Sequence, residues 1–190
     1  MQRRTLLKQL AFATGGAMLL PACVRDIRQG SLALKNLKVS ASQEDLVAAI
    51  METIIPTTDT PGAKDLQLQQ FALRMIDDCF APEDQQTFLA GLSEFEKLAE
   101  EKLGDPFLEA DRETQEKFVR ELDGAKSGND ETEKKKTVHA FYSMLKNLTI
   151  HGYTTSEYVM TNQLHYNMIP GRFQGCVEVT DAKDFKTILG

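Results

Sequence analysis

The sequence lacks the motifs by which many enzymes hold a metal, a haem or a nucleotide. Its 190 residues include only three cysteines, and these lack the spacing of a zinc site or of a haem attachment motif. There is also no phosphate-binding loop and no dinucleotide fingerprint. Ser93 and Ser143 lack the sequence context of an activated nucleophile. We therefore expect no catalytic residue, no metal ligand and no cofactor-binding residue in this chain.

Long apolar runs and an excess of positive charge are also missing. The apolar segment Leu10–Leu20 has 11 residues, whereas a membrane-spanning helix needs about 20. Beyond residue 22, the chain carries 19 Lys and Arg against 28 Asp and Glu, a net charge of −9. Binding of nucleic acid depends on clustered Lys and Arg. The acidic balance therefore argues against a nucleic-acid partner.

The first 23 residues have the pattern of a bacterial export signal. Arg3, Arg4 and Lys8 precede the apolar segment, as in twin-arginine signals, whose translocation machinery moves folded proteins. Leu20-Pro21-Ala22-Cys23 resembles a lipobox, in which Cys23 carries the lipid and becomes the first mature residue. We therefore predict a periplasmic protein, anchored to the membrane through Cys23. The alternatives are a signal that is cleaved without lipidation and a buried N-terminal helix.

The other two cysteines, Cys79 and Cys176, would lie in a compartment that permits disulfides. A bond between them needs α-carbons about 4.4–6.8 Å apart, a distance that the sequence does not give. Cys79 lies on an apolar helical stripe, so a free buried thiol is an equal alternative. Cys176 follows two glycines in an irregular tail and is the better candidate for a bond, within this chain or to a partner.

Apolar residues recur three and four positions apart, and this spacing predicts an all-α fold. No segment shows sustained two-residue alternation, so a sheet is not indicated. We expect an irregular bundle of five or six helices with an extended, turn-rich C-terminal arm. The first helix opens at Ser42, its expected N-cap, and others cover about 66–80, 82–103, 111–122 and 138–152. The expected organisation is an export signal (1–22), a lipid-anchor site and tether (23–41), a helical domain (42–177) and an unassigned tail (178–190).

Three local patterns bear on candidate sites. Thr154 and Glu157 have the spacing of a capping box, which predicts a sharp corner and a new helix after Gly152. Adjacent residues on a helix point in different directions, so Asp77-Asp78 is interpreted as one exposed and one boundary acid rather than a carboxylate pair. The three histidines, His139, His151 and His165, are expected on different elements, which disfavours a metal site with Glu157 or Cys176.

Four separated stretches occur together in one known family. They are residues 53–63 (TIIPTTDTPGA), 77–80 (DDCF), 148–157 (LTIHGYTTSE) and 170–176 (PGRFQGC). In this order, and with the twin-arginine leader, they resemble the gluconate 2-dehydrogenase subunit 3 family. The resemblance runs from about residue 45 to residue 177.

This resemblance implies a non-catalytic, all-α subunit of a periplasmic, membrane-associated dehydrogenase. In that family the large subunit binds FAD, is of the glucose-methanol-choline type and oxidises gluconate or related sugars and sugar acids. A cytochrome c subunit, with haem c, often takes the electrons. The alternatives are a free-standing periplasmic lipoprotein that binds a small ligand or metal, and a small enzyme acting alone.

The partner surface that we expect combines a loop, the corner and the C-terminal arm. These segments consist of particular prolines, glycines and aromatic residues, whereas a bundle could build its connections from almost any polar residues. The expected partner-binding residues are Pro56, Asp59, Pro61, Gly62, Tyr153, Thr154, Ser156, Glu157, Pro170, Gly171, Phe173 and Gly175.

Overall fold

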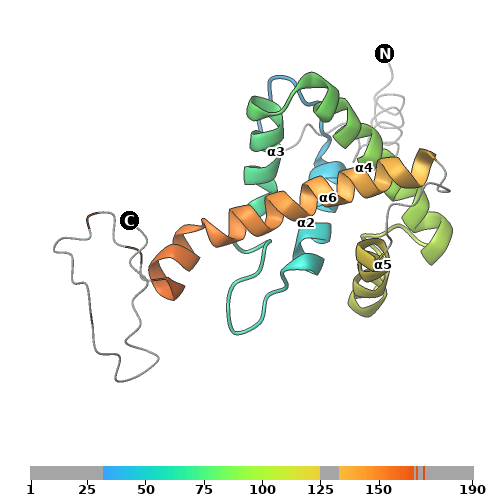
Figure 1. The fold of residues 1–190 in the computed structure, drawn as a ribbon. Coiled ribbons are helices and arrows are strands. Elements are labelled where there is room, and N and C mark those ends of the chain that lie inside the picture. Colours follow the sequence, from blue (N-terminus) through green and yellow to red (C-terminus); the bar gives the residue numbers. More distant parts are fainter. Residues whose placement is uncertain (1–31, 125–132, 165, 167–168, 170–190) are drawn as a thin grey trace, which may run out of the picture.

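The chain folds into helices, which confirms the all-α prediction. The computed structural model describes residues 32–124, 133–164, 166 and 169. Within these ranges it has five α-helices and one short π-helix (Figure 1): α2 (Ala41–Ile54), α3 (Leu68–Cys79), α4 (Pro82–Leu103), α5 (Arg112–Gly124), α6 (Glu133–Thr154) and η2 (Val159–Gln163). The predicted C-terminal arm lies outside the described residues.

Helices α4 and α6 form the centre of the bundle. α6 runs across the molecule in Figure 1, and α2, α3 and α4 all pack against it. α4 and α6 approach closely at Gly91, where an added Cβ would lie 2.3 Å from the Cβ of Phe141 and 2.9 Å from the carbonyl oxygen of Thr137. Glycine at position 91 therefore allows the two helices to pack closely.

Local sequence signals set the ends of two helices. α4 begins at Pro82, whose missing N–H costs nothing in a first turn, and its C-cap is Gly104. The φ of Gly104 is 81°, a left-handed conformation that favours glycine. For α2 the predicted N-cap, Ser42, is wrong. Ser40 caps this helix, because its Oγ accepts from the Gln43 N–H at 3.2 Å and its own N–H donates to Gln43 Oε1 at 3.1 Å.

Four phenylalanine rings form a cluster between α4, α6 and the start of α5. Phe95 of α4 lies at their centre, with ring centroids 5.3 Å from Phe107, 5.4 Å from Phe118 and 5.8 Å from Phe141. All four rings are buried, and edge-to-face pairs of this kind add about 0.5–1.5 kcal/mol beyond the burial of their area. Since Phe107 precedes α5 and Phe118 lies within it, the cluster links α5 to α4, and α5 otherwise packs against α2.

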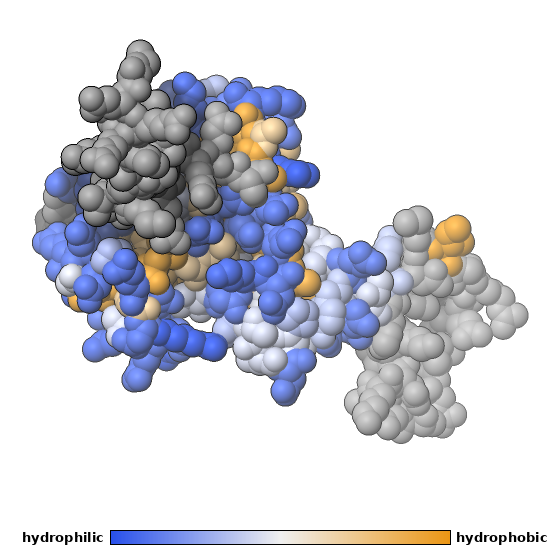
Figure 2. All heavy atoms as spheres, turned by 180° about the vertical axis from the view of Figure 1, so that it is seen from behind, coloured by the Kyte–Doolittle hydropathy of each residue, from blue (hydrophilic) through white to orange (hydrophobic). Residues whose placement is uncertain are grey.

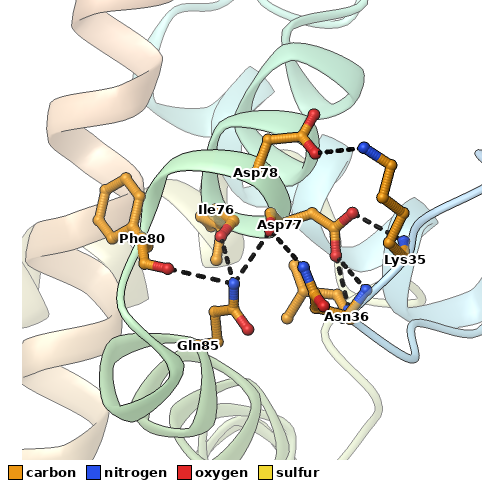
Figure 3. Close-up of polar contacts among 8 residues, drawn as sticks. Lys35, Asn36, Ile76, Asp77, Asp78, Phe80 and Gln85 are labelled. Carbon is orange, nitrogen blue, oxygen red and sulfur yellow. Dashed lines mark hydrogen bonds and ion pairs between the residues drawn. The ribbon is translucent and has the colours of Figure 1, made fainter.

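Residues 32–40 dock on the bundle before α2 begins. Leu37 is 4% exposed and belongs to the hydrophobic core. The N–H of Lys35 donates to Oδ2 of Asp77, and those of Asn36 and Leu37 donate to Oδ1, each at 2.7 Å (Figure 3). These residues are therefore part of the folded domain and do not belong to the predicted tether.

Asp77 is buried at the end of α3 and is only 4% exposed. Burial by itself would raise the pKa of this carboxyl, but the N–H groups of Lys35, Leu37 and Asn36 outweigh it, so the pKa lies below its ordinary value. On the far side of the helix end, the side-chain amide of Gln85 from α4 donates to the carbonyls of Ile76 at 3.0 Å and Phe80 at 3.2 Å (Figure 3). Three segments of the chain therefore meet at the end of α3.

The face of the described part seen in Figure 2 is mostly hydrophilic. In Figure 2 hydrophobic residues show only in small patches between polar ones. Among the residues that the structure describes, the exposed large apolar side chains are Leu108, Ile150, Tyr166 and Ile169. Among the described helices, none combines the length and the apolar character that crossing a membrane requires.

We expect Gly91→Ala to destabilise the fold by about 1–3 kcal/mol, because the new methyl group forces α4 and α6 apart. Urea denaturation followed by circular dichroism measures this change. Gly124→Ala is the matched control, since in the described part of the chain no atom outside its own helix turn lies within 4 Å of the methyl group that it adds. Equal stability of the two variants would contradict the close packing at Gly91.

We expect Asp77→Asn to lower the free energy of unfolding by about 1–3 kcal/mol at neutral pH, since charge-assisted hydrogen bonds are lost. The pKa of Asp77 is lower in the folded chain than in the unfolded one. The stabilisation is therefore complete above the unfolded value of about 3.9 and is lost as pH falls through the folded pKa.

Urea titrations of wild type and Asp77→Asn between neutral and acidic pH measure this difference. The two stabilities should converge as the solution becomes acidic. A difference that stays constant at every pH would contradict an ionised carboxylate at this position.

Candidate partner-binding surface

The loop between α2 and α3 contains four of the expected partner-binding residues, Pro56, Asp59, Pro61 and Gly62. Carboxylates on both sides of the loop hold its backbone. Glu52 accepts from the N–H of Thr57 and from the N–H of Lys64, each at 2.8 Å. Asp65 accepts from the N–H of Gly62 at 3.2 Å. The loop is thus tied to the end of α2 by its own flanking residues.

The hydroxyl of Thr57 lies between these two carboxylates. Its Oγ1 is 2.9 Å from Oε1 of Glu52 and 2.7 Å from Oδ2 of Asp65. Two hydrogen bonds lower the pKa of Asp65 below its ordinary value. The bond from the Thr57 hydroxyl has the larger effect and the bond from the Gly62 N–H the smaller one. Asp65 is therefore ionised at neutral pH and can keep accepting both hydrogen bonds.

Gly62 shapes this loop from within. It is buried, and an added Cβ would lie 2.5 Å from the backbone nitrogen of Thr57 and 2.8 Å from Oε1 of Glu52. Pro56 and Pro61 are half-buried, whereas Asp59 is exposed. A partner that binds this loop would therefore contact Asp59 and the two prolines. Gly62 is needed because a larger residue would not fit between Thr57 and Glu52.

The corner after α6 exists, but it is not built as predicted. α6 continues through Gly152 to Thr154, whose hydroxyl donates back to the carbonyl of Ile150 at 2.9 Å. Ser156 caps the next turn, because its Oγ accepts from the N–H of Val159 at 3.3 Å and donates to the carbonyl of Tyr153 at 2.7 Å. The predicted capping role of Thr154 is therefore wrong, since its hydroxyl is used within α6.

The corner lines an open hollow of about 580 Å³ beside the start of α3. Leu66, Leu68 and Phe71 form one side, and Gly152 with Thr155–Tyr158, Thr161 and Asn162 forms the other. An added Cβ on Gly152 would lie 2.7 Å from Cδ1 of Phe71, so this glycine allows Phe71 to pack over α6. The hollow thus joins the corner to the beginning of α3.

The expected surface is brought together only in part. Ser156 and Glu157 line the hollow together with Leu66, which follows the α2–α3 loop, whereas Pro56, Asp59, Pro61 and Gly62 are not among its lining residues. Tyr153 is half-buried against the core, and Thr154 is exposed. The remaining predicted residues lie outside the described part of the chain: Arg3, Arg4, Cys23, Pro170, Gly171, Phe173, Gly175 and Cys176.

The exposure of Cys79 and of the two acids before it was predicted correctly only for Asp78. Cys79 is exposed at the end of α3, so a buried thiol there is wrong. Its bond with Cys176 stays a prediction. Asp78 is exposed as expected and pairs with the Lys35 ammonium at 3.1 Å, whereas Asp77 is fully buried rather than at the boundary. Asp77 accepts from the backbone N–H of Lys35 and Asp78 pairs with the side-chain ammonium of the same residue, so the two carboxylates do not form a catalytic pair.

Two of the histidines share one helix. His139 and His151 both lie on α6, which corrects their predicted placement on different elements, although 12 residues of helix still separate them by about 18 Å. The ring of His151 packs near Phe71, at 5.9 Å between centroids. Within the described ranges, no three His, Cys, Asp or Glu side chains are grouped so that they could hold a metal ion.

Three acidic residues with structural roles were missed by the sequence reasoning: Glu52, Asp65 and Asp77. Each accepts backbone N–H groups from an irregular segment. Glu52 and Asp65 flank a loop rich in threonine, proline and glycine, and this position is a usable signal for loop-holding acids. Asp77 has no such local signal, because its partners lie about 40 residues earlier in the chain.

Comparison with known proteins gives the family. Residues 41–171 match the family described as gluconate 2-dehydrogenase subunit 3, a range that includes all the helices of the described structure, the loop and the corner. No curated protein and no solved structure matches the chain. The family match agrees with the resemblance carried by the four sequence stretches. The chain therefore belongs to the gluconate 2-dehydrogenase subunit 3 family.

Proposed function

We propose that this chain is the non-catalytic small subunit of a periplasmic, FAD-dependent dehydrogenase complex that oxidises gluconate or a related sugar. The observation that carries the proposal is the family match over residues 41–171, which is most of the chain. The family itself implies membership of a multi-subunit dehydrogenase. In our proposal the large subunit is a flavoprotein of the glucose-methanol-choline type, and a cytochrome c subunit accepts its electrons.

The helical domain would bind the large subunit through the loop and the corner. Both segments are held in place by hydrogen bonds to their own flanking residues, so little conformational entropy is lost when a partner binds them. A stable pair of subunits buries about 1,600 Å² or more in total. A surface of that size extends beyond the hollow, and we propose that the arm at Pro170–Cys176 supplies further contact.

The leader would supply the export signal for both subunits. A flavoprotein folds around FAD in the cytoplasm, and the twin-arginine pathway carries folded cargo outward. A large subunit without its own signal would then be exported while bound to this chain. Lipid on Cys23 would keep the complex at the membrane, since the several acyl chains of a bacterial lipoprotein anchor firmly.

Cell fractionation tests whether this chain carries the export signal for the flavoprotein subunit. The chain is co-expressed with a signal-less flavoprotein subunit, either as wild type or with Arg3→Lys and Arg4→Lys together. In the double variant we expect most FAD-dependent dehydrogenase activity to stay in the cytoplasm, because the translocation machinery reads the arginine pair. Gln9→Ala, also in the leader but outside the pair, is the matched control and should export normally.

Two results would contradict the proposal. Periplasmic activity in the double variant equal to that of wild type would rule out this chain as the carrier of the signal. Recovery of the chain from membranes with no flavoprotein attached would instead favour a free-standing lipoprotein that binds a small ligand or metal.

A further inference from the structure

The buried carboxylate of Asp77 holds the part of the chain that joins the leader to the helical domain. Its two oxygens accept three consecutive N–H groups, those of Lys35, Asn36 and Leu37, each at 2.7 Å. Asn36 adds a further bond from its side-chain amide to the carbonyl of Asp77 at 2.8 Å (Figure 3). A carboxylate that accepts several backbone N–H bonds binds them more strongly than a neutral acceptor would.

Apolar contacts support the same docking. Leu37 is buried in the core, and Leu32, Leu34 and Val39 are half-buried against it. The intervening Lys35 and Lys38 side chains are exposed. The segment therefore covers hydrophobic core while its charged residues remain in solvent, and it docks through side chains as well as backbone.

The docking site is complete only in the folded domain. Asp77 lies 40 residues after Leu37, so α3 must pack near the start of α2 before the carboxylate reaches the segment. Gln85 of α4 caps the end of α3 by donating to the carbonyls of Ile76 and Phe80. The position of Asp77 thus depends on α3 and α4 together.

We propose that Asp77 is a latch that fixes where the N-terminal leader leaves the folded domain and limits how far the leader reaches from it. The role of the leader rests on the proposed function, whereas the latch itself is a property of the folded chain. With the latch closed, Lys35 is the twelfth residue after Cys23, and the two are at most about 40 Å apart. With the latch open, the free chain extends to the start of α2 and spans about 60 Å.

The latch gives the leader a defined exit beside the end of α3. In the proposed complex, a lipid on Cys23 would then hold this end of the bundle within about 40 Å of the membrane surface. Asp77 acts here as a positioning residue, because it touches neither a partner nor a substrate in this role. Its effect is to restrict a segment that would otherwise be free.

Limited trypsin digestion of the purified full chain tests the latch. Trypsin cuts after Lys35 and Lys38, and both bonds are in the docked segment, where the backbone is held away from a protease. Asp77→Asn places an NH₂ group where an oxygen accepts an N–H. We expect cleavage at these bonds to become about tenfold faster or more. Asp105→Asn is the matched control, since Asp105 is an exposed acid after α4 that makes none of the segment's hydrogen bonds, and it should cut at the wild-type rate.

Two further variants separate opening of the latch from loss of overall stability. Leu37→Ala weakens the docking from the segment's side without touching Asp77, and we expect the same selective cleavage. Gly91→Ala weakens the core but leaves the latch in place, so cleavage after Lys35 and Lys38 should not be favoured over cleavage elsewhere. In the latch variants, the fragment that begins at Val39 should persist.

Equal cleavage rates at Lys35 and Lys38 in wild type and Asp77→Asn would overturn the latch. Cleavage spread evenly over the domain in Asp77→Asn would also overturn it, because that pattern reports general unfolding. The digestion needs no flavoprotein, membrane or export, so failure of the latch is distinguishable from failure of the proposed function.

Discussion

The close packing of α4 on α6 is the contact on which the rest of the structure depends. It is possible because Gly91 leaves space for Phe141. Phe95 of α4 contacts Phe141 of α6 and also Phe118 of α5, and α5 in turn packs against α2. Each central helix also positions one of the irregular regions. The N-terminal part of α4 brings Gln85 to the end of α3, and the C-terminal end of α6 leads into the corner at Ser156.

Carboxylates hold the segments that lie outside the helices. Glu52 and Asp65 fix the α2–α3 loop, and Asp77 fixes the segment before α2. In each case an acid at or near a helix end accepts backbone N–H groups that have no partner in a helix or sheet. An ionised acceptor suits this purpose, since it bonds more strongly than a neutral one. The family stretch at 77–80 therefore includes a residue that shapes the chain itself, Asp77, and the acids that hold the stretch at 53–63 flank it at Glu52 and Asp65.

The sequence predicts the helices well and the irregular segments less well, for physical reasons. The limits of α4 are correct because Pro82 and Gly104 are strong local signals. The continuation of α6 through Gly152 is not predicted. This glycine makes room for Phe71 of another helix and does not mark the end of α6. Asp77 resembles a surface acid in its local sequence, and its burial depends on N–H groups about 40 residues away. Such long-range pairing leaves no periodic signal, so only the fold reveals it.

In the proposed function, the helical domain binds a flavoprotein and the leader directs the export of both subunits. Hydrogen exchange of the chain, alone and bound to the large subunit, tests the binding claim most directly. The account predicts slower exchange on binding in the loop at residues 56–63 and in the corner at Tyr153–Tyr158, with Lys35–Leu37 unchanged because Asp77 already protects them. A stable complex in which neither the loop nor the corner gains protection, or the absence of any complex, would contradict it.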